Sequence, residues 1–456
     1  MSLAIALDLG TTSIKAALLD ANGVLQHFVR QAAPSIKASN GRFESDALAY
    51  AEMAEQVLAE CLSHSAECPP LGMCSQRSSF LIWERASGKP VTPLISWQDD
   101  RGEAACEALH EHETLIHSLT GLRLTAYYFA PKLHVLLQQH PQWRVYLERG
   151  DWLLGTLDTF LIWRWTDGSH HLTDASMAAR SLLMDITRAQ WSPVLGKLFD
   201  IPLNVLPQIV PSTNMALPLN NGLTLQASLG DQSAAFLASI SHDSDALVNL
   251  GTGGFVMRTM ADVTRTADGY LHTLLYQDGG THFAIEGTIN SISAALAPYP
   301  AGQCRIEDLA SNDIFCLAEQ SGLGAPYFRS DLGILFSQPI NQLTPAQIVA
   351  LLLEAIVFRV ARIVEDFARG SPLKHVYLSG GVSTLPALQQ GIAQCVACEV
   401  HLLAEKDSSL QGATLLACGK AAPQDEAGER IMPESNPKLL VKYRAWKTWL
   451  DERLQH

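Results

Sequence analysis

The sequence has no run of about 18 uncharged apolar residues, so it predicts no transmembrane helix. Residues 1–20 lack the basic segment that begins a signal peptide, and they include Asp8. Basic residues are also few, because 32 Lys and Arg stand against 46 Asp and Glu and give a formal net charge of -14. Phosphate backbones bind basic surfaces, so this balance argues against a general nucleic-acid-binding role. We therefore expect a cytoplasmic protein that acts on a small molecule and has no nucleic-acid or membrane partner.

Cysteine is sparse and scattered, with nine residues among 456. The single CxxC, from Cys395 to Cys398, has no second pair, so two half-buried cysteines near a strand are a simpler interpretation than a zinc or redox site. The length allows two or three domains with large cores. The polar segment 241–245 interrupts two apolar stretches and predicts a boundary between an N-terminal lobe, residues 1–238, and a C-terminal lobe, residues 239–456.

Two glycine-threonine segments, about half a chain apart, each begin one half of the sequence. Residues 5–20 and residues 246–257 both combine an apolar strand, a Gly/Thr turn and a second apolar strand. Such a hairpin directs backbone N–H groups and hydroxyls toward one point, which suits a phosphate. A single Gly-Thr turn is more often only a turn. Two copies, with Asp8 at the end of one buried strand, favour a pair of hairpins that hold a polyphosphate between two lobes.

Hydrophobic spacing predicts two helices that frame these segments. One covers residues 46–63 and begins at a Ser or Asp cap, and a longer one covers residues 344–369. The long helix carries few charges, so we expect it to be buried. A strand at residues 375–378 then runs into Gly380 and Gly381, and glycine at this point lets a flat ligand approach the backbone closely.

Short motifs are spread along the chain from residue 4 to residue 419. They include ALDLGTT at 6–12, QR at 76–77, SWQD at 96–99, GTLDT at 155–159, TDAS at 173–176, GDQSAA at 230–235, GTG at 251–253, GLGAPY at 322–327, SGGVS at 379–383 and GAT at 412–414. In kind and order they resemble the FGGY family of carbohydrate kinases, whose members include glycerol kinases and xylulokinases. The resemblance implies an α/β fold of two ribonuclease-H-like lobes, of the actin, sugar-kinase and Hsp70 type, with a central nucleotide and sugar cleft. It also implies transfer of a phosphoryl group from ATP, with Mg²⁺, to a terminal hydroxyl of a small sugar or polyol.

Asp231, in the segment Gly230-Asp231-Gln232, matches the catalytic base of that family. A carboxylate at this position accepts the proton of the attacking hydroxyl. The local sequence alone favours a different role, in which the Asp caps the helix that begins at Gln232. The two roles are compatible, and the resemblance favours the base.

The resemblance assigns a further group of residues to the metal and the nucleotide. Asp8 matches the residue that holds Mg²⁺, through water because magnesium dehydrates reluctantly, while the local alternative is an Asp bonded to the following turn. Lys15 stands where glycerol kinases have Arg. Lysine keeps the positive charge but lacks the planar guanidinium that binds a phosphate through two parallel hydrogen bonds. The other matched positions are Thr11, Thr12, Ser13, Gly251, Thr252, Gly380 and Gly381, with Gly381 on the adenine side.

A second group matches the polyol contacts of glycerol kinase: Arg77, Trp97, Tyr127, Asp231, Gln232 and Phe255. Arg and Gln bind hydroxyls, and Trp97 with Phe255 would enclose the carbon chain, although both aromatics fit an ordinary core equally well without the resemblance. Ser78 belongs to this pocket and replaces a Glu whose carboxylate binds the terminal hydroxyls in glycerol kinases. This departure predicts a polyol or ketose of four to six carbons as the preferred substrate, with glycerol as a lesser one.

Other departures affect the nucleotide side. Leu385 and Ala297 stand where relatives have Asn and Gln, and the segment 287–321 is shorter than in those relatives. These departures favour a second interpretation, a catalytically weak sugar-sensing regulatory protein on the same fold. The intact hairpins and Asp231 favour the kinase. Dimers are common in the family, so the resemblance is compatible with a homodimer.

Overall fold

The computed structural model describes residues 2–261, 269–404, 407–420 and 428–455, and their contacts divide the chain into two compact units. The first unit is formed by Met1–Ala238, His272–Phe283 and Asp407–Ala422, and the second by Ser239–Leu271, Ala284–Lys406 and Pro423–His456. Sheets and helices alternate in both units, which confirms the predicted α/β class. None of the described helices is both long enough and apolar enough to cross a membrane.

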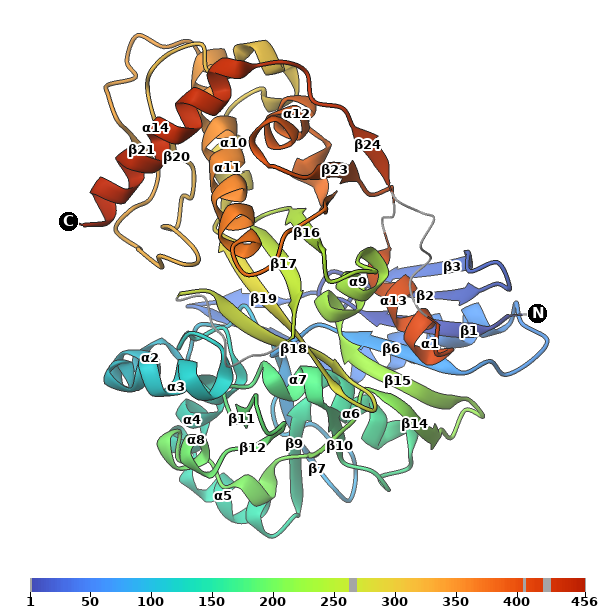
Figure 1. The fold of residues 1–456 in the computed structure, drawn as a ribbon. Coiled ribbons are helices and arrows are strands. Elements are labelled where there is room, and N and C mark those ends of the chain that lie inside the picture. Colours follow the sequence, from blue (N-terminus) through green and yellow to red (C-terminus); the bar gives the residue numbers. More distant parts are fainter. Residues whose placement is uncertain (1, 262–268, 405–406, 421–427, 456) are drawn as a thin grey trace. The chain divides into compact units, whose positions relative to one another are not determined.

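A six-stranded mixed sheet forms the centre of the first unit (Figure 1). Its order is β14 (Thr213–Pro218), β15 (Thr224–Gly230), β6 (Leu71–Ser75), β1 (Ala4–Leu9), β2 (Ser13–Leu19) and β3 (Leu25–Ala32). Strand β1 is antiparallel to β2 and parallel to β6, which is parallel to β15. The carboxyl ends of β1, β6 and β15 therefore lie at one edge of the sheet, where ligands of open α/β sheets bind.

Two helices from opposite ends of the chain pack on this sheet. Helix α1 (Ala47–Leu62) agrees with the predicted helix, and the Asp46 carboxylate caps it by accepting bonds from the N–H groups of Leu48 and Ala49 at 3.0 Å. Helix α13 (Ser408–Ala417) contacts β1, β6 and β15. Figure 1 shows this late, red segment beside the blue N-terminal strands. The first unit is therefore completed by residues from near the end of the chain.

The remainder of the first unit contains a second sheet and several short helices. The sheet has the order β4 (Lys37–Ser39), β5 (Arg42–Ser45), β8 (Leu94–Ile95), β7 (Phe80–Glu84) and β9 (Trp152–Thr156). The helices are α2 (Glu103–Ala108), α3 (Glu113–Thr120), α4 (Phe129–Gln139), α5 (Pro141–Glu148), α6 (Leu157–Trp165), α7 (Ala175–Ala179), α8 (Pro193–Leu198) and α9 (Asp231–Ser239). Two further sheets have two strands each and pair β10 (Leu172–Asp174) with β13 (Gln208–Val210), and β11 (Met184–Asp185) with β12 (Gln190–Trp191).

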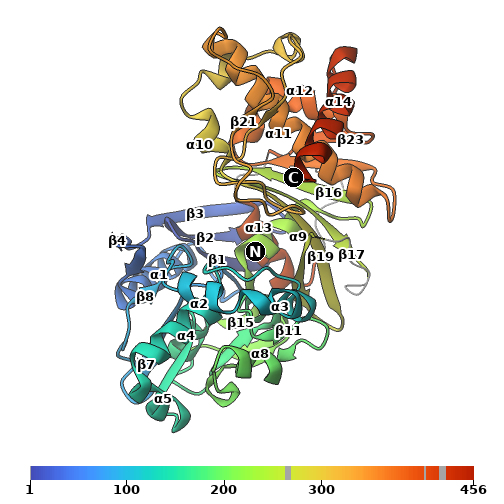
Figure 2. The same ribbon diagram turned by 90° about the vertical axis from the view of Figure 1, so that its left-hand side faces the viewer.

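The second unit contains most of a seven-stranded sheet, drawn in Figure 2, of which the residues His272–Phe283 are counted in the first unit. Its order is β18 (Leu271–Gln277), β19 (Thr281–Ile289), β17 (Gly254–Met260), β16 (Asp245–Leu250), β22 (His375–Ser379), β23 (Glu399–Leu402) and β24 (Glu429–Ile431). Strand β16 is antiparallel to β17 and parallel to β22, so the second hairpin repeats the pairing pattern of the first. The other elements are α10 (Ile292–Leu296), β20 (Cys316–Leu317), β21 (Leu335–Phe336), α11 (Pro345–Ala368), α12 (Pro386–Cys395) and α14 (Pro437–Leu454).

Helix α11 is the core of the second unit and confirms the long buried helix that the sequence predicts. Thr344 caps it in a capping box with Gln347. Its buried Arg359 lies 2.6 Å from Glu319 and also donates to the Ala325 carbonyl at 2.7 Å, with both charged side chains only 1% exposed. A buried charge is tolerated only when it is paired and hydrogen-bonded, and these contacts meet that condition.

Candidate active site

Asp231 is the first residue of α9, directly after the buried strand β15. Its Oδ1 accepts a bond from the Gln232 N–H at 2.7 Å and lies 3.7 Å from Nε of Arg77. One third of the side chain (33%) is exposed, so a substrate can reach the carboxylate. The surrounding protein raises the pKa of Asp231 by removing water, and the Arg77 charge opposes that rise. Asp231 therefore stands at the start of a helix and presents an accessible carboxylate, and its role as the catalytic base stays a prediction.

Arg77 and Gln232 form the neighbouring polar pair. Arg77 is 4% exposed, and its guanidinium contacts the side-chain oxygen of Gln232. Because the Arg comes from the end of β6 and the Gln from the start of α9, two adjacent parallel strands bring them together. The guanidinium of Arg77 and the amide of Gln232 therefore place hydrogen-bond donors beside the Asp231 carboxylate.

Asp8 is the second acidic group of this edge. It faces Lys15 across the β1–β2 hairpin, with Nζ 3.8 Å from Oδ2, and Oδ2 also accepts a bond from the Ser409 hydroxyl at 2.8 Å. The residue is only 5% exposed, and burial raises its pKa to about 6, against the lowering effects of Lys15 and Ser409. Among the described residues nothing donates to Oδ1 of Asp8. A buried carboxylate oxygen without a donor suits a cation, so the residue fits the magnesium role that the sequence suggested.

The Lys15 ammonium has a second partner just before α13, since it donates to Oδ1 of Asp407 at 2.8 Å. Its pKa is raised because, although burial lowers it, the two carboxylates Asp407 and Asp8 favour the charged form more strongly. Neither Asp407 nor Ser409 was predicted from the sequence. Their positions carried no local motif, and only the packing of α13 on β1 reveals them.

The turn after β1 connects the predicted phosphate residues to the predicted sugar residues. Nε1 of Trp97 donates to the Thr11 hydroxyl at 2.9 Å, and that hydroxyl donates to Oε1 of Gln76 at 3.2 Å. Gln76 also accepts a bond from Ser79 at 2.9 Å, and the Ser79 hydroxyl receives the Trp97 N–H at 3.0 Å. Gln76 is therefore the residue that joins the two groups. Of the other turn residues, Thr12 is exposed and Ser13 is buried at the start of β2.

An aromatic wall stands beside Trp97. The ring of Tyr127 lies 5.3 Å from that of Trp97 and 5.0 Å from that of Tyr128. The fully buried Lys132 supports the wall from behind, because its Nζ donates to the carbonyls of Ser96 at 3.0 Å and Tyr127 at 2.9 Å. Burial lowers the pKa of Lys132 to about 7.

Ser78 lies inside the protein, with 1% of its surface exposed. Its hydroxyl donates to the Arg180 carbonyl at 2.9 Å, and its backbone has a φ of 63°, in the left-handed region. The residue follows Arg77 directly, so it supplies no carboxylate where a Glu would stand.

The second unit carries the remaining predicted residues. Gly251 and Thr252 form the turn between β16 and β17, where Gly251 N–H donates to the Gly253 carbonyl at 2.8 Å and Thr252 is exposed. The Thr252 carbonyl accepts the Ser293 N–H at 3.1 Å, which ties the turn to α10. Phe255 is partly buried in β17.

Gly380 and Gly381 follow β22. Gly380 has a φ of 91°, and a side chain there would meet the Leu250 backbone, so only glycine fits this approach. Gly381 is exposed and has open space where a Cβ would stand, which leaves its backbone accessible to a ligand.

Comparison with known proteins agrees with this arrangement. Residues 3–246 match the model of the N-terminal domain of the FGGY family of carbohydrate kinases, and residues 246–421 match the C-terminal domain. The chain belongs to the FGGY family of carbohydrate kinases and has its two-domain fold.

Named relatives include two kinds of sugar or polyol kinase. The chain is 31% identical to the apulose kinase of Pectobacterium atrosepticum, with 97% of each protein covered. It is also 31% identical to the glycerol kinase of Acinetobacter baylyi, over 92% of this chain and 90% of the relative. Among solved structures, the glycerol kinase of Plasmodium falciparum with ADP superposes with a TM-score of 0.86 at 23% identity and covers 99% of this chain and 98% of its own.

Proposed function

We propose that this carbohydrate kinase transfers the terminal phosphoryl group of ATP to a terminal hydroxyl of a four- to six-carbon ketose or polyol. The accessible Asp231 carboxylate at the start of α9, flanked by Arg77 and Gln232, carries the proposal. Phosphoryl transfer needs positioning and charge stabilisation more than covalent chemistry, and this edge of the sheet offers both.

Asp231 acts as the general base and accepts the proton of the attacking hydroxyl at its free carboxylate oxygen. Arg77 and Gln232 donate hydrogen bonds to the neighbouring hydroxyls and hold the sugar chain. The Trp97 and Tyr127 rings give the carbon skeleton an apolar wall, with Phe255 of the second unit as a further contact. The raised pKa of Asp231, caused by burial, makes the carboxylate a stronger base than an ordinary Asp.

The phosphates are the proposed ligands of Thr11, Thr12, Ser13 and Lys15 in the first unit and of Gly251 and Thr252 in the second, with Gly380 and Gly381 next to the base of the nucleotide. Asp8 would hold Mg²⁺, whose charge would neutralise the phosphate oxygens. Lys15 contributes a second positive charge at the same strand end, because it lies 3.8 Å from Asp8.

The preference for a substrate larger than glycerol depends on Ser78. Its hydroxyl is engaged with the Arg180 carbonyl, so position 78 adds no second carboxylate next to Arg77 for the small triol. Relatives of equal identity are named apulose kinase and glycerol kinase, so both substrate kinds belong in the test.

A second candidate is a catalytically weak sugar-sensing regulatory protein. The shortness of α10, which has 5 residues, favours it, because this helix supports the Thr252 turn. Under this alternative the protein binds sugar without measurable ADP release.

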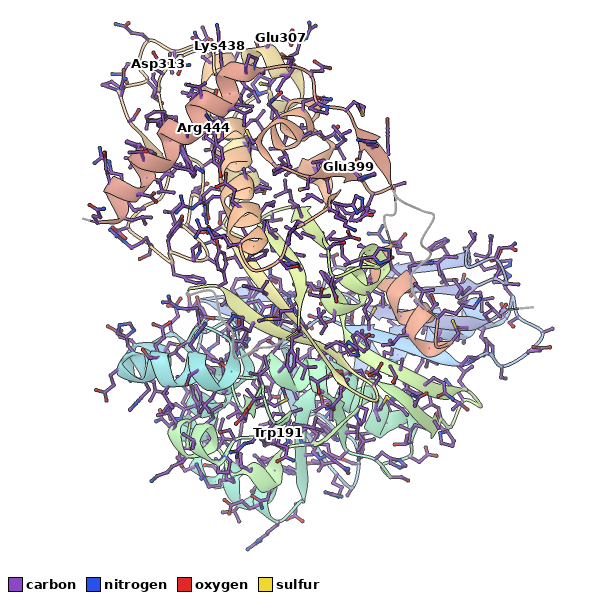
Figure 3. All side chains as sticks on the ribbon, viewed as in Figure 1. Trp191, Glu307, Asp313, Glu399, Lys438 and Arg444 are labelled. Carbon is purple, nitrogen blue, oxygen red and sulfur yellow. The ribbon has the colours of Figure 1, made fainter. Side chains whose placement is uncertain are left out.

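An ADP-release assay over four- to six-carbon ketoses and polyols, with glycerol included, tests the proposal. Asp231→Asn should abolish most release, and Asp313→Asn, at an exposed carboxylate of the second unit labelled in Figure 3, serves as the matched control. Sugar-dependent thermal stabilisation without ADP release would support the sensor instead. Equal ADP release by wild type and Asp231→Asn would contradict the assigned base.

A further inference from the structure

Three potential metal ligands share one face of the second unit's sheet. His375 begins β22, and Glu399 begins the neighbouring β23 directly opposite it. His401, two residues further along β23, points to the same face because side chains alternate along a strand. One donor atom from each of the three residues lies within 4.8 Å of the other two.

Both histidines are oriented by a bond to the opposite ring nitrogen. Nδ1 of His375 donates to Oδ1 of Asp245 at 2.9 Å, and Nδ1 of His401 donates to the Gly428 carbonyl at 3.2 Å. Because a carboxylate and a carbonyl only accept, the protons lie on Nδ1 and the Nε2 lone pairs remain available. Metal-binding histidines show the same pattern, with the second nitrogen held by a carboxylate or a backbone carbonyl.

The Nε2 atom of His401 is the strongest sign of a metal ligand in this group. His401 is 8% exposed, and among the described residues its Nε2 forms no hydrogen bond. Oε2 of Glu399 lies 3.7 Å from this Nε2 atom. Two ligands at about 2.1 Å on a tetrahedral Zn²⁺ are roughly 3.4 Å apart, so this pair is already near the required separation. His375 is partly exposed, and one of its ring nitrogens lies within 4.8 Å of the donor atoms of Glu399 and His401.

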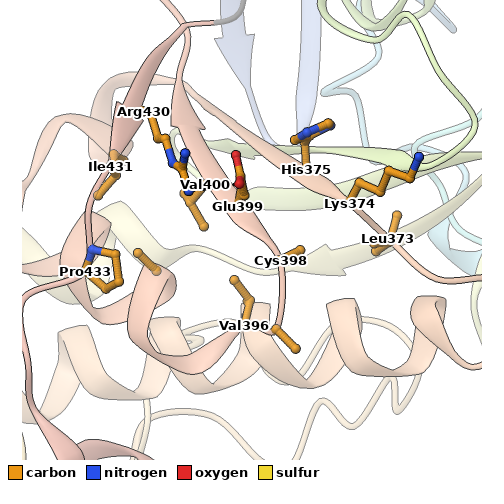
Figure 4. A pocket seen from close by; sticks show the side chains of 12 residues that line it. Leu373, Lys374, His375, Val396, Cys398, Glu399, Val400, Arg430, Ile431 and Pro433 are labelled. Atoms are coloured by element: carbon orange, nitrogen blue, oxygen red, sulfur yellow. Dashed lines mark ion pairs between the residues drawn. The ribbon is translucent and has the colours of Figure 1, made fainter.

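Arg430 sets the role of the carboxylate. Its guanidinium lies 2.8 Å from Oε1 of Glu399, and Figure 4 shows the two side chains on adjacent strands at a surface hollow that His375 also lines. Oε1 is therefore occupied, and Oε2 is left for an ion. Two imidazoles and one carboxylate oxygen suit a borderline divalent ion such as Zn²⁺ better than Mg²⁺ or Ca²⁺, which prefer oxygen ligands.

We propose that His375, Glu399 and His401 bind one divalent transition-metal ion, with Asp245 and the Gly428 carbonyl as outer partners. The ion would fasten β23 to its neighbour β22 and, through Asp245, to β16. His375 and Asp245 are the first residues of β22 and β16, and they lie roughly 16 Å and 20 Å along the strands from Gly380 and Gly251, respectively. The site is thus separate from the proposed nucleotide contacts, and its ion is structural.

The test uses purified, metal-stripped full-length protein without substrate. Titration of Zn²⁺ against a chromophoric chelator should give one ion per chain for wild type and none for His401→Ala. Co²⁺ should give the visible absorption of a tetrahedral site only in wild type. Asp245→Asn should retain the site with affinity lowered about 10–100-fold, as expected for an outer partner.

Two further variants keep the test decisive. Glu399→Gln changes a partly exposed side chain without removing volume, so it should lose Zn²⁺ binding even if His401→Ala folds poorly. His282→Ala alters an exposed histidine beside Asp278 in the other unit and should bind Zn²⁺ as wild type does. Zn²⁺ should also raise the Tm of wild type and of His282→Ala, but not that of Glu399→Gln. If wild type binds no stoichiometric Zn²⁺, or if Glu399→Gln binds it equally well, the proposal is wrong.

Discussion

The β1–β2 hairpin of the first unit and the β16–β17 hairpin of the second have the same backbone plan and different chemistry. In each, the first strand pairs in parallel with a neighbour and turns back through a Gly-Thr segment. Two positions before the turn, Asp8 faces Lys15 in the first hairpin, whereas Asn249 faces Phe255 in the second. The comparison teaches that one supersecondary unit can supply a charged centre in one lobe and a neutral, partly aromatic surface in the other.

The largest expected effect follows from removing the base on the charged side. Asp231→Asn should lower kcat by roughly 10²–10⁴-fold, the usual contribution of a general base, because the amide cannot accept the hydroxyl proton. Steady-state ADP release measures it, with Asp313→Asn alongside. Substrate-dependent thermal stabilisation should persist, and retention of more than about half of wild-type turnover would show that another group is the base.

Exchanging the chemistry of the two hairpins should give a smaller, asymmetric effect. Asp8→Asn gives the first hairpin the amide of the second and should lower kcat by about 10²–10³-fold, the scale of losing one electrostatic contact in a transition state. The reverse change, Asn249→Asp, should be milder, because it removes no group that the charged centre uses. Mg²⁺ titrations of activity separate the two variants, since only Asp8→Asn should need more metal. Equal losses would mean that the two hairpins are equivalent.

Substrate choice should respond at Ser78. Wild type should use glycerol about 10–150-fold less well than its preferred substrate, because a hydrogen bond to a charged group is missing beside Arg77. Ser78→Glu should move kcat/KM toward glycerol, while Ser78→Ala, which removes only the bond to the Arg180 carbonyl, should leave the ratio unchanged. An unmoved ratio in Ser78→Glu would show that position 78 does not face the sugar.

The smallest expected effect is a pH dependence set by Asp231. Its pKa in the folded protein is raised above the ordinary 3.8, so the acid limb of kcat/KM should lie above pH 3.8 and activity should fall as the pH drops through the raised pKa. Between the ordinary pKa and the raised pKa, the folded state binds more protons at Asp231 than the unfolded state does. The free energy of unfolding therefore falls as the pH rises through this range. At neutral pH, Asp231→Asn should therefore be at least as stable as wild type, with the difference in Tm vanishing below the ordinary pKa. A less stable variant at pH 7 would contradict this sign.

The elements and the chemical motifs could be predicted from the sequence to different extents. The hairpins, α1, α11 and the strand before Gly380 follow from local signals: apolar runs, caps and glycine. The family also follows from the motifs, because each is short but their order is specific. The roles of the individual site residues remain proposals.

The sequence does not predict the contacts of site residues that belong to no recognisable motif. Ser409 and Asp407 reach Asp8 and Lys15 only because α13 packs on β1. Gln76 joins Thr11 to Trp97 through a turn whose geometry depends on three separate segments. Such contacts depend on the packing of distant segments, which the spacing of residues along the chain does not predict.

The position of α13 has a consequence for how the protein is made. The bond between Asp8 and Ser409 joins residues 401 positions apart. At a synthesis rate of about 5–20 residues per second, the ribosome adds Ser409 roughly 20–80 s after Asp8. During this time the sheet of the first unit lacks the helix α13 on one of its faces. The contacts of Asp8 and Lys15 with Ser409 and Asp407 form only when nearly the whole chain has been translated. Incomplete chains therefore lack part of the proposed phosphate-binding edge, so we expect the enzyme to become active only when its synthesis is nearly complete.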